Sequence, residues 1–202
     1  INKFHSVKPG LHLIPYGRAA EGKYQLLDHR QSQGLNSFRL AGFEEVFHLP
    51  LPGYHVALDA SAAIALTELL LSYDGLELDS SKIDLIKTGL SQFRGSKRRS
   101  EMLGEARGIL FLDDYAHHPT AIKTTLRGYR EYFPDRRLVV DFMSHTYSRT
   151  QALLDDFAEA FSDADEVILH EIYASARERN TSVISGERLY REVVKNHPSV
   201  RY

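Results

Sequence analysis

The sequence contains no cysteine, and its charges nearly cancel, with 25 lysines and arginines against 27 aspartates and glutamates in 202 residues. Without cysteine, disulfides and thiolate metal sites are excluded, and a reducing, cytoplasmic location fits this composition. The formal net charge of −2 argues against a general binder of nucleic acids or membranes. We expect no apolar stretch long enough to span a bilayer, and no signal peptide is recognisable.

Two further features are missing from the sequence. No GxGxxG motif follows any predicted strand, which argues against a nicotinamide-binding Rossmann domain. The chain begins with Ile1 and not with methionine, so we expect it to be part of something longer.

The stretch FLDDYAHHPT, residues 111–120, holds the most reactive cluster of side chains. The apolar run 109–112 before it predicts a buried strand. Pro119 then opens a helical pattern, at the position where a missing N–H costs nothing. The acids, the tyrosine and the histidines therefore lie between a strand end and a helix start. In open α/β sheets that edge is where ligands bind.

The same pattern of an apolar run followed by a polar loop then recurs twice. The run 138–143 leads into SHTYSRT, and the run 167–169 leads into HEIYASARER, with helical spacing between them. Strands alternating with helices predict a parallel sheet with right-handed crossovers. Parallel strands would place all three loops along one edge. We therefore expect one cleft to gather Asp114, His117, His145, Arg149 and Tyr173.

The first half of the chain has a different pattern. Short alternating segments predict strands at 12–16, 24–27, 36–40 and 45–49, and apolar periodicity predicts helices at 57–71 and 81–92. The segment FRGSKRRSE, residues 93–101, then interrupts the apolar pattern with a glycine and four basic residues. We expect a domain boundary there, which divides the chain into 1–97 and 98–202.

Four segments in consistent order resemble the Mur ligases, the ATP-dependent amide-forming enzymes of peptidoglycan synthesis. They are PGYHVALDASAAIAL, FRGSKRRSEMLG, DDYAHHPT and SHTYSRTQALLDDFAEAF. The last one is most similar to the PHRYSRT segment of the member that adds L-alanine. The relative that recycles murein tripeptide typically shows a different segment, with PRS, at this point.

The resemblance implies an α/β fold with two parts. Residues 1–97 would be the latter part of a central ATP-binding domain, made of strands and helices. Residues 98–202 would be most of a Rossmann-like C-terminal domain with a mostly parallel sheet, truncated at its end. The family's GxxGKT-type phosphate loop and its UDP-sugar domain are not in this sequence. We therefore expect the 202 residues alone to be inactive.

The resemblance also implies a reaction. ATP would phosphorylate the carboxylate of UDP-N-acetylmuramate, and the amine of L-alanine would attack the acyl phosphate. Mg²⁺ would assist, with ligands mostly upstream of this chain. Arg98 and Arg99 would stabilise the γ-phosphate; the alternative is a solvated basic linker. Asp114 would contact the nucleotide, unless it only caps the next helix. Tyr115 and His117 would line the cleft, and the adjacent histidines make a poor metal-chelating pair.

The remaining family positions concern the amino acid and the adenine. His145, Arg149 and Tyr173 would bind the incoming L-alanine, with Arg149 paired to its carboxylate; alternatively Arg149 only faces solvent at a helix start. His55 and Asp59 would lie near the adenine.

Two substitutions leave further alternatives open. Thr146 replaces a family arginine, and Val56 replaces an asparagine whose amide can both donate to and accept from adenine. The parent could therefore be a divergent ligase with another amino-acid or peptide specificity, a degenerate ligase, or a non-catalytic nucleotide-binding module.

Overall fold

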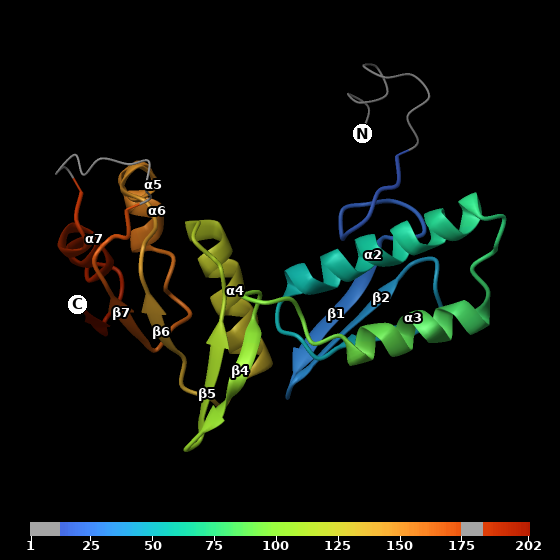
Figure 1. The fold of residues 1–202 in the computed structure, drawn as a ribbon, viewed down its shortest axis with the longest axis horizontal. Helices are drawn as coiled ribbons and strands as arrows, with labels where there is room; N and C mark the ends of the chain where they lie inside the picture. The colour runs from blue at the N-terminus through green and yellow to red at the C-terminus, as the bar shows by residue number, and fades with distance from the viewer. Residues whose placement is uncertain (1–12, 175–183) are drawn as a thin grey trace. The chain divides into compact units, whose positions relative to one another are not determined.

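The computed structural model describes residues 13–174 and 184–202 (Figure 1). The chain divides into two compact units. The first unit runs up to Gln31 and continues through Leu35–Pro50 and Tyr54–Phe93. The second unit consists of Arg94–Tyr202 together with the short segments Ser32–Gly34 and Leu51–Gly53.

The first unit is built on a three-stranded sheet in the order β1 (Leu26–Ser32), β2 (Leu35–Leu40), β3 (Val46–Leu49). The chain turns between β1 and β2 at Gln33 and Gly34, whose φ angles of 49° and 83° are typical of the I′ turn in tight hairpins. β2 and β3 are antiparallel. Their side chains alternate between buried and exposed, so one face of this hairpin points into a core.

Two helices, α2 (Tyr54–Tyr73) and α3 (Ser80–Gln92), complete this core. Ala57 and Ile64 of α2 are fully buried against the sheet, and Ile86 of α3 packs at the edge of the same cluster. α3 is capped by Asp79, the residue before its first turn, whose carboxylate accepts the N–H of Lys82 at 3.0 Å.

Two expectations for this half of the chain are wrong. Residues 13–16 form no strand, while His12 of the expected strand 12–16 lies outside the described residues. Helix α2, with 20 residues, reaches the length and apolar content of a membrane span, contrary to the expectation that no stretch would. Its apolar residues are spread around the helix, and one stripe of them packs on the sheet core, a use that length and composition alone do not reveal.

The second unit contains a parallel sheet in the order β6 (Val139–Phe142), β7 (Glu166–Leu169), β8 (Val200–Arg201). Helices α5 (Tyr147–Ala152) and α6 (Leu154–Ala158) connect β6 to β7, and α7 (Gly186–Val193) lies between β7 and β8. This alternation confirms the expected α/β class with a parallel sheet. Helix α4 (Pro119–Tyr132) precedes β6, and Pro119 occupies its first turn as predicted. Side chains of α4, α6 and α7 share one core with β6 and β7.

The expected first strand of this sheet is placed elsewhere. β5 (Ile109–Asp113) pairs antiparallel with β4 (Glu101–Ala106) in a separate two-stranded sheet. Ile109 and Phe111 are 58% and 51% exposed, whereas Leu112 packs against the core. An unbroken apolar run does not show which faces are covered, and here one face is open. Only the loops after β6 and β7 therefore follow neighbouring parallel strands.

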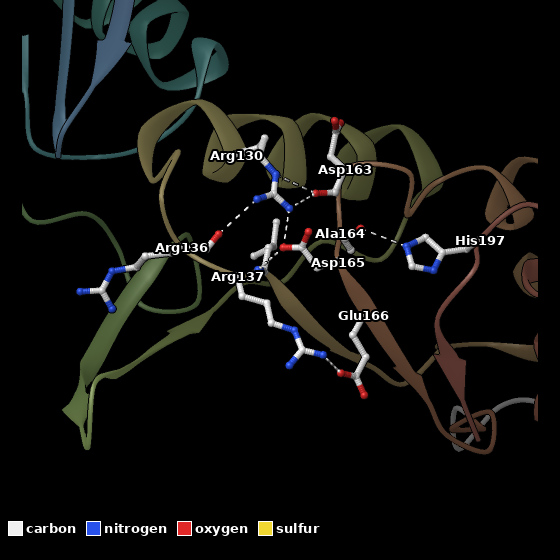
Figure 2. Close-up of polar contacts among 9 residues, drawn as sticks. Arg130, Arg136, Arg137, Asp163, Ala164, Asp165, Glu166 and His197 are labelled. Carbon is white, nitrogen blue, oxygen red and sulfur yellow. Dashed lines mark hydrogen bonds and ion pairs between the residues drawn. The ribbon is translucent and has the colours of Figure 1, made fainter.

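A polar network joins α4 to the beginnings of β6 and β7, as Figure 2 shows. The guanidinium of Arg130 donates to the Asp165 carboxylate at 2.7 Å and to the backbone carbonyl of Asp163 at 3.0 Å. The same carboxylate accepts the backbone N–H of Leu138 at 2.6 Å. The imidazole of buried His197 contacts the Ala164 carbonyl at 3.0 Å. These bonds fix the amino ends of the strands, opposite the edge where the polar loops emerge.

Candidate functional site

Arg98 has a tightly fixed backbone. Its φ of 58° lies in the left-handed region, which is uncommon for a residue other than glycine. Its N–H donates to the Glu101 carboxylate at 2.8 Å, and its carbonyl accepts the N–H of Tyr115 at 2.8 Å. The linker is thus fastened to β4 on one side and to the loop after β5 on the other.

The ring of Tyr115 gathers three predicted site residues. The guanidinium carbons of Arg98 and Arg99 lie 5.1 and 6.0 Å from its centroid, within the range of cation–π attraction. The His117 ring meets the tyrosine edge-on with centroids 5.0 Å apart, and its Nδ1 lies 2.8 Å from the Tyr115 carbonyl. Two cations, an aromatic ring and an imidazole therefore meet at the end of β5, where the guanidinium groups are suited to phosphate oxygens.

Asp114 anchors this loop through both of its carboxylate oxygens. Oδ2 accepts the N–H of Ser100 at 2.7 Å and lies 3.3 Å from its hydroxyl, while Oδ1 accepts the N–H of Ala116 at 2.7 Å. The alternative that Asp114 caps α4 is wrong, because the capping group is His118, whose Nδ1 accepts the N–H of Thr120. Each carboxylate oxygen has two acceptor sites, so Asp114 retains capacity for another donor.

Sequence reasoning missed two residues that support Asp114, namely its direct partner Ser100 and Tyr129, which bonds to Ser100. Ser100 is buried with a left-handed φ of 49°, and its hydroxyl accepts a hydrogen bond from the phenol of Tyr129 on α4 at 3.2 Å. Burial raises the pKa of the Tyr129 hydroxyl above its ordinary value, so the phenol stays protonated and keeps donating. Only the position of Tyr129 in the apolar repeat of α4 hinted at burial.

A second cluster lies at the carboxyl ends of β6 and β7. The rings of His145 and Tyr173 are stacked with centroids 5.4 Å apart, and the two residues form an isolated parallel bridge. Arg149 donates from its guanidinium to the carbonyl of His145 at 2.6 Å. The half-buried arginine therefore turns back onto the loop, and the alternative of a solvent-facing side chain is wrong. The structure brings all three predicted residues together.

Buried hydroxyls support this second cluster. The side chains of Ser144 and Thr150, both fully buried, are 2.6 Å apart, and the carbonyl of Ser144 accepts the N–H of Tyr173 at 2.8 Å. Thr146 caps α5, with its hydroxyl accepting the N–H of Arg149. The hydroxyl groups of Ser144, Thr146 and Thr150 thus fix the loop that carries the predicted ligand-binding groups.

His55 and Asp59 are one helical turn apart on α2, with His55 half-buried and Asp59 exposed. They belong to the first unit, whereas the other eight predicted site residues belong to the second. Across the described residues, no three acidic or histidine side chains gather so that they could hold a metal ion. The acids and histidines in the described part of the chain therefore do not form a magnesium site by themselves.

Comparison with known proteins places these clusters in a family. Residues 98–202, just over half of the chain, match the family described as "Mur ligase, glutamate ligase domain". The chain is 51% identical over 195 residues to the UDP-N-acetylmuramate–L-alanine ligase of Treponema pallidum, covering 96% of this chain and 40% of that protein. It is 37% identical over 207 residues to the enzyme of the same name from Caldanaerobacter subterraneus, covering 100% of this chain and 42% of the relative.

Solved structures give the same result. The crystal structure of UDP-N-acetylmuramate-alanine ligase from Thermotoga maritima matches with a TM-score of 0.71 and 26% identity, over 92% of this chain and 38% of that one. Folylpolyglutamate synthase of Mycobacterium tuberculosis shares the fold, with a TM-score of 0.60 and 23% identity over 88% of this chain and 37% of that one. The chain therefore spans about two fifths of the length of these relatives, and it belongs to the Mur ligase family.

Proposed function

We propose that this chain forms part of an ATP-dependent ligase that joins L-alanine to UDP-N-acetylmuramate in peptidoglycan synthesis. One observation carries the proposal. His145 and Arg149 of the SHTYSRT segment form a compact cluster with Tyr173 of the loop after β7, at the ends of parallel strands, in a chain 51% identical to a protein of that name. The carboxyl edge of a parallel sheet is where α/β enzymes bind their ligands.

In this proposal the chain supplies only some of the machinery. Residues 1–97 are the latter part of a central ATP-binding domain, and 98–202 are most of the C-terminal domain. The matched relatives are about two and a half times as long as the chain, which leaves room for a phosphate loop, a UDP-sugar domain and magnesium ligands elsewhere in the protein. The isolated 202 residues would then lack ligase activity, and the intact enzyme would work in the cytoplasm.

The first chemical step is transfer of the γ-phosphoryl group of ATP to the substrate carboxylate, which gives an acyl phosphate and ADP. Its transition state spreads negative charge over the transferring oxygens, so positioned cations lower the barrier. Arg98 and Arg99, held over Tyr115, supply such cations. Asp114 retains acceptor capacity for a ribose hydroxyl, and Tyr115 and His117 form a wall of the nucleotide site. In the first unit, His55 and Asp59 of α2 are the residues that we propose for the adenine, as the family resemblance implies.

In the second step the amine of L-alanine attacks the acyl carbon, and inorganic phosphate leaves as the amide forms. Arg149 pairs with the carboxylate of the amino acid, which orients its amine. One of its terminal nitrogens is bonded to the His145 carbonyl, and that bond fixes the direction of the guanidinium. The stacked rings of His145 and Tyr173 enclose the small side chain.

A second candidate is a ligase with another amino-acid specificity, and one observation favours it. Thr146 stands where the family has arginine and uses its hydroxyl to cap α5, so this position supplies no charge to a substrate. Val56 likewise replaces an amide on α2. Fewer polar groups at these points could change the amino acid or peptide that is accepted.

Phosphate release by the full-length natural protein separates these candidates. The reaction would contain ATP, Mg²⁺ and UDP-N-acetylmuramate, with L-alanine, L-serine, glycine or no amino acid. We expect release that depends on L-alanine. Dependence on another amino acid would support the second candidate. A folded protein that releases no phosphate with any of them would contradict both and favour a nucleotide-binding module.

A further inference from the structure

We propose that Asp113 is a positioning residue for Arg98, whose guanidinium it holds on the face of Tyr115 in the orientation that receives a phosphoryl group. This inference rests on the proposed function. Asp113 is the last residue of β5 and lies beside Asp114 in the sequence. The two neighbouring acids have different partners, because Asp114 bonds to Ser100 and Ala116 while Asp113 bonds to Arg98.

The geometry fixes Arg98 from three directions. Its backbone is held by Glu101 and by Tyr115, so its Cα cannot shift without breaking two hydrogen bonds. Its guanidinium carbon lies 5.1 Å from the Tyr115 centroid. Nε of Arg98 donates to Oδ2 of Asp113 at 3.2 Å. The carboxylate therefore binds the guanidinium at Nε. The two terminal nitrogens, Nη1 and Nη2, are the pair suited to a bidentate phosphate contact.

Without Asp113 the arginine would have little to restrain it. Its side chain is 60% exposed, and a long exposed side chain samples many rotamers in water. The cation–π contact with Tyr115 limits the distance of the guanidinium from the ring but does not fix the direction in which its nitrogens point. The contact to Asp113 removes this remaining freedom. Since Asp113 is itself 36% exposed, the pair contributes little to fold stability, and its effect is on orientation.

Charge alone predicts the opposite effect. A carboxylate beside a phosphate site repels the incoming anion and offsets part of the arginine charge. If Asp113 acted only through its charge, every neutral replacement would strengthen nucleotide binding. If Asp113 positions Arg98, the result depends on whether the replacement can still accept a hydrogen bond. Asparagine retains an acceptor oxygen at the same place, and alanine does not.

The test compares Asp113→Ala and Asp113→Asn in the full-length natural protein, with kcat and KM for ATP measured at saturating acceptor and amino acid. We expect Asp113→Ala to lower kcat/KM roughly tenfold, the loss expected for one charge-assisted hydrogen bond, through both a lower kcat and a higher KM for ATP. Asp113→Asn should remain within about threefold of the wild type, because the acceptor is preserved. An unchanged Asp113→Ala enzyme, or equal gains in both variants, would overturn the proposal.

Two controls separate positioning from general damage. Glu105→Ala removes another exposed acid of the β4–β5 hairpin, which pairs with Arg136 at 3.0 Å, and should leave the kinetics unchanged. In an Arg98→Ala background, Asp113→Ala should have no further effect, since the group that it positions is gone. A full additional loss in the double variant would overturn the proposal.

Failure of the proposed function would be recognised separately, as a wild-type protein without amino-acid-dependent phosphate release. Calorimetric titration would then measure the affinity of the wild type and of both Asp113 variants for ATP, which tests the positioning role of Asp113 without the ligase reaction. The inference predicts weaker ATP binding for Asp113→Ala than for the wild type and for Asp113→Asn. Equal or tighter binding by Asp113→Ala, or no binding by the wild type, would contradict it.

Discussion

The rings of His145 and Tyr173 lie stacked, with centroids 5.4 Å apart and planes inclined by 18°, although 28 positions separate the residues in the chain. The contact joins the loop after β6 to the loop after β7 at the edge where both parallel strands end. It gives the proposed amino-acid site a wall built from two segments.

The stacked rings predict that substitutions of Tyr173 change KM for L-alanine but not KM for ATP. Tyr173→Ala removes one ring, and an aromatic pair contributes roughly 0.5–1.5 kcal/mol, so KM for L-alanine should rise about two- to tenfold. KM for ATP should hardly change. Tyr173→Phe keeps the ring and should behave like the wild type. Steady-state kinetics of the full-length protein provide the comparison, and an unchanged KM for L-alanine in Tyr173→Ala would exclude this role.

We expect Arg149 to contribute more to binding of the amino acid than to binding of the nucleotide. Arg149→Ala removes the partner of the substrate carboxylate, a loss of roughly 1.5–3 kcal/mol, and should raise KM for L-alanine accordingly. Arg149→Lys keeps the charge but not the fork that also bonds to the His145 carbonyl, so it should recover only part of the affinity. Equal changes in KM for ATP and for L-alanine would argue against a carboxylate contact.

The two adjacent acids of the loop after β5 should differ in their contribution to stability. Asp114→Ala leaves the N–H groups of Ser100 and Ala116 without their acceptor and should lower the free energy of unfolding by roughly 2–4 kcal/mol. Asp113→Ala removes only a half-exposed ion pair and should cost less than about 1 kcal/mol. Urea denaturation followed by circular dichroism measures both. Similar losses in the two variants would show that Asp114 is not an anchor.

The Arg130–Asp165 pair in Figure 2 predicts a pH dependence. The hydrogen bond from Arg130, followed by that from the Leu138 N–H, lowers the pKa of Asp165 below its ordinary value. A carboxyl with a lowered pKa in the folded state stabilises the protein fully above its ordinary pKa of about 4. This contribution is lost as the pH falls through the lowered value.

Asp165→Asn should therefore reduce stability at pH 7 and flatten its decline below about pH 4. Asp163→Asn is the matched control, because Asp163 offers Arg130 only a backbone carbonyl, which the substitution retains. Thermal unfolding between pH 7 and pH 2 would show the difference. A decline in Asp165→Asn as steep as in the wild type would contradict the linkage.

Two glycines should respond oppositely to alanine. A Cβ on Gly186 would lie 2.7 Å from the His170 carbonyl oxygen and 2.8 Å from the Glu171 Cα, so α7 would have to move away from the end of β7. Gly186→Ala should cost roughly 1–3 kcal/mol through this overlap. A Cβ on Gly89 of α3 meets nothing within 4 Å, and Gly89→Ala should stabilise by up to about 1 kcal/mol. Differential scanning calorimetry would measure both changes in stability. A Gly186→Ala variant as stable as the wild type, or more stable, would contradict the packing at Gly186.

The sequence was sufficient to predict the elements whose signals are local. Pro119 marked the start of α4, and the runs around Val140 and Ile168 marked β6 and β7. The clustering of His145 with Tyr173 followed from the rule that parallel strands end at one edge. These signals depend on neighbouring residues or on general rules of chain topology, and neither requires knowledge of the packing.

The remaining features depend on contacts between residues far apart in the chain. Asp114 is an anchor because Ser100, 14 positions earlier, adopts a left-handed conformation, and no residue type at that position signals this. β5 was misplaced because an apolar strand with one open face has the same composition as one covered on both. The role proposed for Asp113 depends on the position of Arg98, 15 positions earlier, which the sequence does not show.

The account is tested most directly by identifying the product that the full-length natural protein forms from ATP, Mg²⁺, L-alanine and UDP-N-acetylmuramate labelled with ¹⁸O in its carboxylate. Mass spectrometry should find the L-alanyl amide of the UDP-sugar and one ¹⁸O atom in the released phosphate, because the acyl phosphate passes a carboxylate oxygen to phosphorus. Absence of the L-alanyl amide, or an amide accompanied by unlabelled phosphate, would contradict the account.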